Sequence, residues 1–321
     1  MAIEKEEFVK EEKKLERVNK QLDKVFRSLE KEIFQKEEEL LSFKKLNWDQ
    51  KSSFDSQEFN QVMVQSDQEA FQILSKRAYF KKLNNIKTKP YFASFIYEED
   101  NKTFNIYMAL TYLRENETDN ILYDWRSPIC SIFYDFENGP CEYQAPGGIF
   151  KGTLKRKRQY KIENNKLIHI FDNSINIDDE VLQEVLANNS SEKMKNVVNT
   201  IQKDQNRIIR NVEDRNLIVQ GIAGSGKTSV ALHRIAFLLY RIKNLNSNNV
   251  LIFSPNNIFT EYISNVLPEL GEDNTLQTTF SDYLSFFIKE YKKVESFTNF
   301  IERYYKDKTI DYELIKYKQS K

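Results

Sequence analysis

The sequence predicts an α/β protein built from three consecutive parts. A helical coiled-coil arm is expected over residues 1–89, a small antiparallel β module over 90–175, and a domain with a parallel sheet over 176–321. No proline precedes Pro90 and no glycine precedes Gly139, which is typical of long helices because both residues interrupt them. Runs rich in aromatic and β-branched residues come next. From about Asp178 onward, helix-like and strand-like runs alternate, which favours a parallel sheet.

The arm is predicted from apolar spacing. Leu15, Leu22 and Leu29 recur every seventh residue, and valines stand between them, which is the seam of a coiled coil. A second apolar run at helical spacing, 59–74, is expected to fold back on the first. At 1.5 Å per residue, a helix of about 40 residues extends roughly 60 Å, so the hairpin should project as an arm.

The turn of the arm is expected at residues 47–56, because Ser, Asn and Asp in this stretch favour turns and helix caps. The charges around it are mostly acidic, and Asp49 and Asp55 mark the expected tip. This acidity fits a contact surface or an ordinary solvated loop equally well.

In the β module, strands are expected at 91–97, 103–108 and 131–134, with 167–172 as the last strand. Asp-Asn and Gly-containing turns separate these runs. A basic run, residues 155–158, could contact a phosphate backbone, but one solvated strand face is the favoured interpretation.

The chemistry-bearing motif is a glycine-rich loop. An apolar strand is predicted at 216–220, the loop Gly221-Ile222-Ala223-Gly224-Ser225-Gly226-Lys227-Thr228 follows it, and an amphipathic helix follows the loop. Strand, GxxxxGK[ST] and helix together predict a P-loop. Its glycines let backbone N–H groups approach phosphate oxygens, and the helix N-terminus adds partial positive charge. Lys227 is expected to reach the β- and γ-phosphates, and the Thr228 hydroxyl to ligate Mg²⁺, which makes these two the candidate catalytic residues.

Two flanking segments resemble parts of superfamily-one helicases. Gln205 precedes the loop at the position where those proteins read adenine, and an amide can donate to and accept from the adenine edge. A second buried strand at 249–254 and its following helix stand where such helicases touch single-stranded nucleic acid. An ordinary strand-turn-helix explains that second segment equally well. The predicted ATP-binding set is Gln205, Gly221, Ile222, Ala223, Gly224, Ser225, Gly226, Lys227, Thr228 and Ser229.

Composition limits the remaining classes of function. Lys plus Arg and Asp plus Glu both number 48, so the zero net charge argues against a wholly basic nucleic-acid binder. Two cysteines are too few for a disulfide framework, and two histidines make a His-built zinc site unlikely to form. The N-terminus carries no signal peptide and no membrane span, so the expected location is the cytoplasm.

Several longer segments resemble the HelD family, the UvrD-like ATPases of Gram-positive bacteria that bind RNA polymerase. They are 124–128 (Asp-Trp-Arg-Ser-Pro), 148–160, 179–186, 193–195 and 254–271. The resemblance implies that ATP-driven motion releases RNA polymerase from nucleic acid and recycles it. It also implies that the arm enters the polymerase secondary channel, with Asp49 and Asp55 at the tip. Single-stranded DNA is a further implied partner, and ATP and Mg²⁺ are the implied cofactors.

The chain departs from a complete motor of this kind. After Thr228 no apolar strand ends in Asp-Glu, and the sensor and the arginines of a second RecA-like lobe have no counterpart. We therefore expect an incomplete RecA-like P-loop domain that binds ATP weakly and hydrolyses it negligibly, in the N-terminal portion of a HelD-like protein. Two alternatives stay open: a 3′–5′ DNA helicase of the UvrD type, and a coiled-coil adaptor with a non-hydrolysing nucleotide site.

Overall fold

The computed structural model describes residues 5–49, 55–115, 119–172, 203–288, 295, 297–306, 313 and 316. Segments 179–186 and 193–195, which carried part of the resemblance, lie outside this set. The chain divides into two compact units. One unit is Met1–Leu251 with Glu261–Leu276, and it contains the arm, the β module and the glycine-rich loop. The other is Ile252–Thr260 with Gln277–Lys321.

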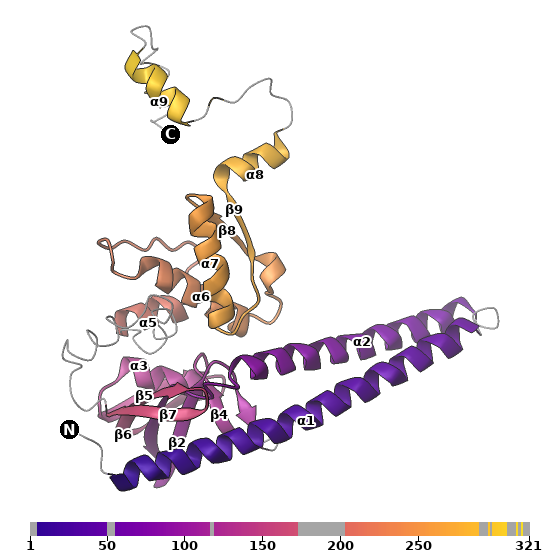
Figure 1. Cartoon of the computed structure of the whole chain (residues 1–321), viewed down its shortest axis with the longest axis vertical. Helices are drawn as coiled ribbons and strands as arrows, with labels where there is room; N and C mark the ends of the chain where they lie inside the picture. Colours follow the sequence, from indigo (N-terminus) through magenta and orange to yellow (C-terminus); the bar gives the residue numbers. More distant parts are fainter. Residues whose placement is uncertain are drawn as a thin grey trace. The chain divides into compact units, whose positions relative to one another are not determined.

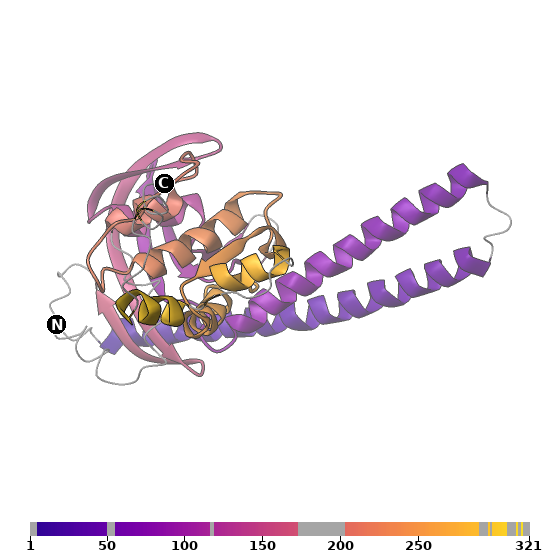
Figure 2. The same cartoon turned by 90° about the horizontal axis from the view of Figure 1, so that it is seen from above.

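The predicted arm is a pair of long helices, α1 (Lys5–Asp49) and α2 (Ser56–Asn85), which run side by side in both views (Figures 1 and 2). The 45 residues of α1 correspond to about 68 Å. Asp55 begins α2 as its N-cap: its carboxylate accepts from the backbone N–H groups of Gln57 and Glu58, and the Glu58 side chain accepts from the Asp55 N–H. This capping box satisfies donors that the first helical turn would otherwise leave unpaired.

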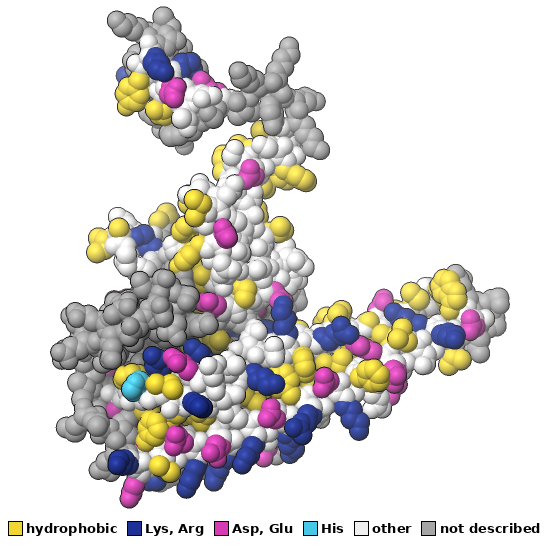
Figure 3. Space-filling model, in the orientation of Figure 1, with side chains coloured by type: hydrophobic (Ala, Val, Ile, Leu, Met, Phe, Trp, Pro, Cys, Tyr) yellow, Lys and Arg dark blue, Asp and Glu magenta, His cyan; other side chains and the backbone are white. Residues whose placement is uncertain are grey.

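The core of the arm follows the predicted seven-residue repeat only in its half nearer the sheet. Apolar side chains of α1 are buried from Leu15 to Ile33, and Phe26 meets Phe80 of α2 edge to face at 4.9 Å. Further along, large apolar side chains are exposed on both helices: Phe34, Leu41, Leu46, Trp48, Met63, Val64, Phe71 and Leu74. Charged side chains of both signs lie among apolar ones along this surface (Figure 3). Packing therefore holds the hairpin near its base, and its distal half keeps an apolar surface available.

The β module forms a seven-stranded sheet in the order β3-β4-β2-β1-β6-β5, with β7 paired to β6. The strands are β1 (Ala93–Glu99), β2 (Lys102–Ala109), β3 (Leu113–Arg114), β4 (Asn120–Asp124), β5 (Gly139–Ala145), β6 (Gly148–Glu163) and β7 (Lys166–Asp172). The expected Asp-Asn turn is present, with positive φ at Asp100 and Asn101 as a two-residue hairpin requires. The sheet is mixed, because β2 and β4 pair in parallel, whereas a purely antiparallel module was expected.

One predicted strand of this module is wrong. Residues 131–134 lie in the helix α3 (Ser131–Asp135), which directly follows the 3₁₀ turn η2 (Pro128–Cys130). Pro128 stands at the start of that turn, where its fixed φ and missing N–H suit the first turn of a helix. Ile132, Phe133 and Tyr134 are buried there. These side chains are buried, as their apolar character predicts, but Pro128 starts a helical turn instead of a strand.

The basic run 155–158 is largely a structural element of β6. Lys157 and Arg158 are buried, contrary to the expected solvated face. The Lys157 ammonium donates to the carbonyls of Phe133 and Phe136, and the Arg158 guanidinium pairs with Asp172 and with Glu7 and Glu11 of α1. Arg158 thus fastens the base of the arm to the sheet, while Lys157 binds within the β module. A buried charge is stable only when it is paired.

After the module the chain forms α5 (Lys203–Arg210), α6 (Lys227–Arg241), the turn η4 (Ser247–Asn249), β8 (Leu251–Ser254), α7 (Asn257–Glu269), β9 (Leu276–Thr279), α8 (Phe280–Phe287) and α9 (Phe297–Lys306). The strand predicted at 249–254 forms over 251–254, but it is not buried as expected, since Leu251 is 44% and Phe253 49% exposed. The helices after the loop and after that strand are confirmed. β8 pairs with β9 in a two-stranded sheet. The strand predicted at 216–220 does not form, and Ile218 is 94% exposed. A strand needs a neighbour for its backbone hydrogen bonds, and the described residues place none beside this segment.

Candidate functional site

The glycine-rich loop has the backbone that its glycines predict. Gly224 and Gly226 both have positive φ, at 83° and 78°, a region that side-chain-bearing residues rarely adopt. A Cβ on Gly221 would lie 2.6 Å from the Ser225 Oγ, so the loop closes tightly at its first glycine as well. The loop leads directly into α6, whose first turn leaves N–H groups without helical partners. This backbone is a cradle that an anion can fill.

Lys227 is the cation of this cradle. It is the first residue of α6, and its ammonium donates to the carbonyl oxygens of Gly221 at 2.8 Å and Ile222 at 2.6 Å. The side chain therefore folds back over the loop that it belongs to. Thr228 follows as the second residue of the helix, at the position where its hydroxyl can ligate a metal ion bound to phosphate. The residues present thus fit a nucleoside triphosphate and Mg²⁺.

Gln205 of α5 lies against the loop. Its amide nitrogen is 3.5 Å from the Ser225 carbonyl oxygen and lies 3.3 Å from where a Cβ on Gly226 would stand. The structure thus brings together the glutamine and the loop, which are separated in sequence by a segment without helix or strand. Ile222 is 82% exposed, so the cradle is open on that side.

A buried histidine stands one turn into α6. His233 Nδ1–H donates to the Ser229 carbonyl at 2.7 Å, which leaves Nε2 as an acceptor without a partner among the described residues. The ring of Trp125 meets His233 edge to face at 5.6 Å. Burial lowers the pKa of His233 to about 4, because the charged form would lose its hydration. This histidine is therefore neutral at pH 7 and packs the helix that begins at the loop.

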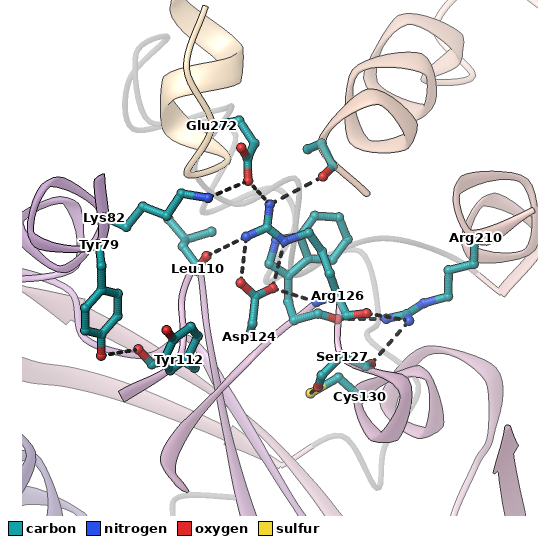
Figure 4. Close-up of polar contacts among 12 residues, drawn as sticks. Tyr79, Lys82, Leu110, Tyr112, Asp124, Arg126, Ser127, Cys130, Arg210 and Glu272 are labelled. Atoms are coloured by element: carbon teal, nitrogen blue, oxygen red, sulfur yellow. Dashed lines mark hydrogen bonds and ion pairs between the residues drawn. The ribbon is translucent and has the colours of Figure 1, made fainter. Parts of the chain in front are cut away.

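Arg126 is the centre of a buried polar cluster between this helix and the β module (Figure 4). Its guanidinium forms a two-pronged pair with Asp124, from Nε at 2.8 Å and from Nη2 at 2.6 Å. Nη1 also pairs with Glu272 and donates to the Ala236 carbonyl of α6. Burial alone would lower the pKa of Arg126, and the two carboxylates raise it above its ordinary value. The charge stays on the guanidinium because every side of it is paired.

The same cluster reaches the arm. Glu272 also accepts from the Lys82 ammonium of α2 at 3.0 Å. Glu272 is held in place by the end of α7, where Gly271 has a φ of 86° and the Glu272 N–H donates back to the Leu267 carbonyl. This is the usual glycine-ended helix terminus. One carboxylate thus joins the arm base, the β module and, through Arg126, the helix of the glycine-rich loop.

Arg210 fastens α5 to the other side of this cluster. Its guanidinium donates to three consecutive backbone carbonyls, at Trp125 (2.7 Å), Arg126 (3.1 Å) and Ser127 (3.3 Å). Asn206 of the same helix donates to Asp135 at 2.7 Å. Hydrogen bonds and ion pairs therefore hold the segment 124–128 through both its side chains and its backbone. The sequence of this segment resembles the family but predicts no role for it, because its partners are distant in the chain.

The two expected tip residues lie on either side of the arm's turn. Asp49 is the last residue of α1 and is exposed, whereas the Asp55 carboxylate is engaged as the N-cap of α2. The five residues between them, 50–54, lie outside the described set. Asp49 is thus the tip carboxylate whose charge can be changed without removing a helix cap.

The turn after β8, which was weighed as a nucleic-acid contact, has a local structural role. The Asn256 side chain accepts from the Phe259 N–H at 2.9 Å and so begins α7, and the Ser254 hydroxyl donates to the Asn256 carbonyl at 3.1 Å. These bonds suit an ordinary strand-turn-helix, and both interpretations of the turn stay open.

The fold and this site define a class: an α/β protein in which a helical hairpin and a mixed sheet are joined by buried ion pairs to a helix that begins at a P-loop-type loop. A family profile described as "DNA helicase IV HelD, N-terminal domain" matches residues 8–208, more than half of the chain. The chain belongs to this family. The match ends before the glycine-rich loop. Comparison with curated proteins gives no match.

Among the described residues, no helix combines the length and apolar character needed to cross a membrane.

Proposed function

We propose that this chain is the ATP-binding N-terminal portion of a HelD-like protein that binds RNA polymerase and uses ATP to release it from nucleic acid. The observation that carries the proposal is the connection of three parts in one compact unit: the loop, the β module and the arm. Arg126 and Glu272 join these parts through buried charge pairs. A nucleotide-dependent shift of α6 would therefore act directly on the groups that hold the arm base.

Different residues of the site would bind different parts of ATP. The N–H groups at the start of α6 and the glycines of the loop would hold the phosphates, and Lys227 would exchange its two carbonyl partners for phosphate oxygens. Thr228 would hold Mg²⁺, which neutralises phosphate charge when bound. Gln205 lies close enough to the loop to read an adenine attached to those phosphates.

The arm supplies the surface for the polymerase. Its distal half exposes large apolar side chains on both helices, beside the acidic turn. Exposed apolar side chains grouped in this way are typical of protein interaction sites. The proposal requires a cytoplasmic protein, since RNA polymerase acts there.

Charge reversal at the tip tests the polymerase part of the proposal. We expect Asp49→Lys to weaken capture of purified RNA polymerase core enzyme at least fivefold, because the tip would lose its acidic character. The measurement is the apparent Kd from immobilised chain at several salt concentrations.

The matched control is Asp23→Lys, an equal charge change at an exposed position of α1 nearer the sheet. Its affinity should stay within twofold of the unsubstituted chain. If the unsubstituted chain does not capture polymerase, or if both reversals act alike, the proposed role of the tip is wrong.

A further inference from the structure

A cavity lies in the β module, apart from the glycine-rich loop. Its volume is about 430 Å³, within the range of small-molecule sites, and it shares no residue with the loop. The floor is one face of the sheet, because the lining residues of β1, β2 and β5 alternate along each strand: Tyr97 and Glu99, Phe104 and Ile106, Tyr143 and Ala145. Residues of β3 and β4, including Asp124, line another side, together with the turn 127–129 and the Tyr240 side chain of α6.

The walls are mainly aromatic and are held at fixed positions. The Tyr97 ring meets Tyr143 edge to face at 5.9 Å and lies 6.4 Å from Phe104. It rests directly on Gly152, where a Cβ would come within 2.5 Å of the ring. Phe104 is 38% exposed, so part of its ring is accessible, whereas the half-buried Tyr143 ring stacks on Phe150 at 5.1 Å. Such rings form a platform for a flat ligand, since every aromatic base has a face that can stack.

Polar groups lie on both sides of the aromatic walls. Arg114 of β3 donates from Nε to Asn120 at 3.0 Å, and its guanidinium lies 4.9 Å above the Tyr112 ring. Glu99 of β1 lies on the other side, because β4 and β2 separate β3 from β1 in the sheet. Three strand spacings of about 4.8 Å separate the two backbones, so the cation and the carboxylate line different sides of the cavity.

A buried hydroxyl at the wall lacks a hydrogen-bond partner. The Tyr97 hydroxyl is buried and makes no hydrogen bond among the described residues. The pKa of Tyr97 is raised, first by burial and then by the negative charge of Glu99 and by Tyr143, so the hydroxyl lies near these two cavity residues. Buried polar groups in folded proteins normally have partners. A ligand with polar atoms on its edge would supply one, whereas an aliphatic ligand would not.

From these features we propose that the cavity binds a nucleotide unit: a flat base between the aromatic walls and a phosphate at Arg114. The Arg114 terminal nitrogens have no partner among the described residues and can bind phosphate in a two-pronged manner. Glu99 accepts hydrogen bonds from an exocyclic amino group, which favours adenine, cytosine or guanine over uracil. The unit can belong to a free nucleotide or to a single strand of nucleic acid.

A ligand in this cavity would contact α6, the helix that begins at the glycine-rich loop. Tyr240 lines the cavity near the end of α6, and the Arg126 guanidinium lies 4.7 Å from the centre of its ring. A bound base would thus touch the same helix that the loop begins.

The test is binding of fluorescently detected AMP, CMP, GMP and UMP, and of a five-nucleotide single strand, to the full chain carrying Lys227→Ala. That substitution removes the loop's contribution, so any remaining binding belongs to a second site. We expect the amino-bearing mononucleotides to bind at least fivefold more tightly than UMP. Phe104→Ala and Arg114→Ala should each weaken binding at least tenfold. Phe71→Ala and Lys151→Ala, at exposed positions outside the cavity, should leave it within twofold.

Binding of the strand but not of mononucleotides assigns the unit to nucleic acid, and binding of both assigns it to the base and phosphate themselves. The proposal is overturned if neither probe binds in the Lys227→Ala background, or if binding there is unchanged by Phe104→Ala and Arg114→Ala. Circular dichroism of each variant establishes that a loss of binding is not a loss of fold.

Discussion

At the scale of single residues, the helix behind the loop depends on one neutral imidazole. His233 is buried with its Nδ1–H on the Ser229 carbonyl, and its pKa is lowered to about 4. In the unfolded chain a histidine takes up its proton near pH 6.5. The unfolded state therefore binds more protons between these two values, and stability is lost as pH falls from about 6.5 to about 4.

His233→Gln should flatten the loss of unfolding free energy between pH 6.5 and pH 4, a loss of up to about 3 kcal/mol in the unsubstituted chain. The measurement is urea unfolding at a series of pH values. His169→Gln, the same change at the exposed histidine of the chain, should leave the slope as it is. Identical slopes in all three proteins would mean that His233 is not the buried neutral group described.

At the scale of elements, the long strand β6 passes close behind β1 at one glycine. A Cβ on Gly152 would lie 2.4 Å from the Glu98 carbonyl oxygen and 2.5 Å from the Tyr97 ring. Backbone cannot give way as a side-chain end can, so we expect Gly152→Ala to lower the unfolding free energy by about 1–3 kcal/mol. Thermal unfolding followed by circular dichroism measures the effect.

The matched substitution is Gly147→Ala in the turn between β5 and β6. Its nearest neighbour would be the tip of the Phe150 ring at 3.4 Å, so the change should cost less than about 0.5 kcal/mol. Equal effects of the two substitutions would contradict the close approach of β6 to β1.

How far elements can be predicted from sequence depends on whether their cause is local. The absence of glycine and proline predicts the arm, and Asp100-Asn101 predicts the hairpin of β1 and β2. Both predictions succeed because both effects act within a few residues. The strand expected at 131–134 is wrong because Pro128 starts a helical turn. The one expected at 216–220 is wrong because a strand exists only beside a partner, which no local pattern supplies.

The candidate site divides in the same way. The loop and Gln205 could be named from spacing, and the structure brings them within hydrogen-bond distance. The cluster around Arg126 could not, since Glu272 lies 146 residues away in the chain. The buried pairing of Arg158 with Glu7 was hidden for the same reason, and a solvated strand face was the natural interpretation of its basic run.

At the scale of the whole molecule, Arg126 and Glu272 connect parts of the compact unit that are far apart in sequence. Arg126→Met would leave the buried Asp124 carboxylate without its partner, so we expect a loss of about 3–5 kcal/mol of unfolding free energy. Lys81→Met removes the neighbouring exposed pair with Asp273, and should cost less than about 1 kcal/mol. Urea unfolding of both variants decides this, and a cost for Arg126→Met as small as that for Lys81→Met would show that the cluster does not hold the unit together.

In the proposed function, the glycine-rich loop binds the phosphates of ATP through Lys227. Titration calorimetry of the chain with ATP and Mg²⁺ measures this most directly, with Lys227→Ala beside it and the exposed Lys243→Ala as the matched control. We expect measurable binding that Lys227→Ala weakens at least tenfold and that Lys243→Ala leaves within twofold. Absence of binding by the unsubstituted chain at millimolar ATP, or equal affinity of the Lys227→Ala variant, would contradict it.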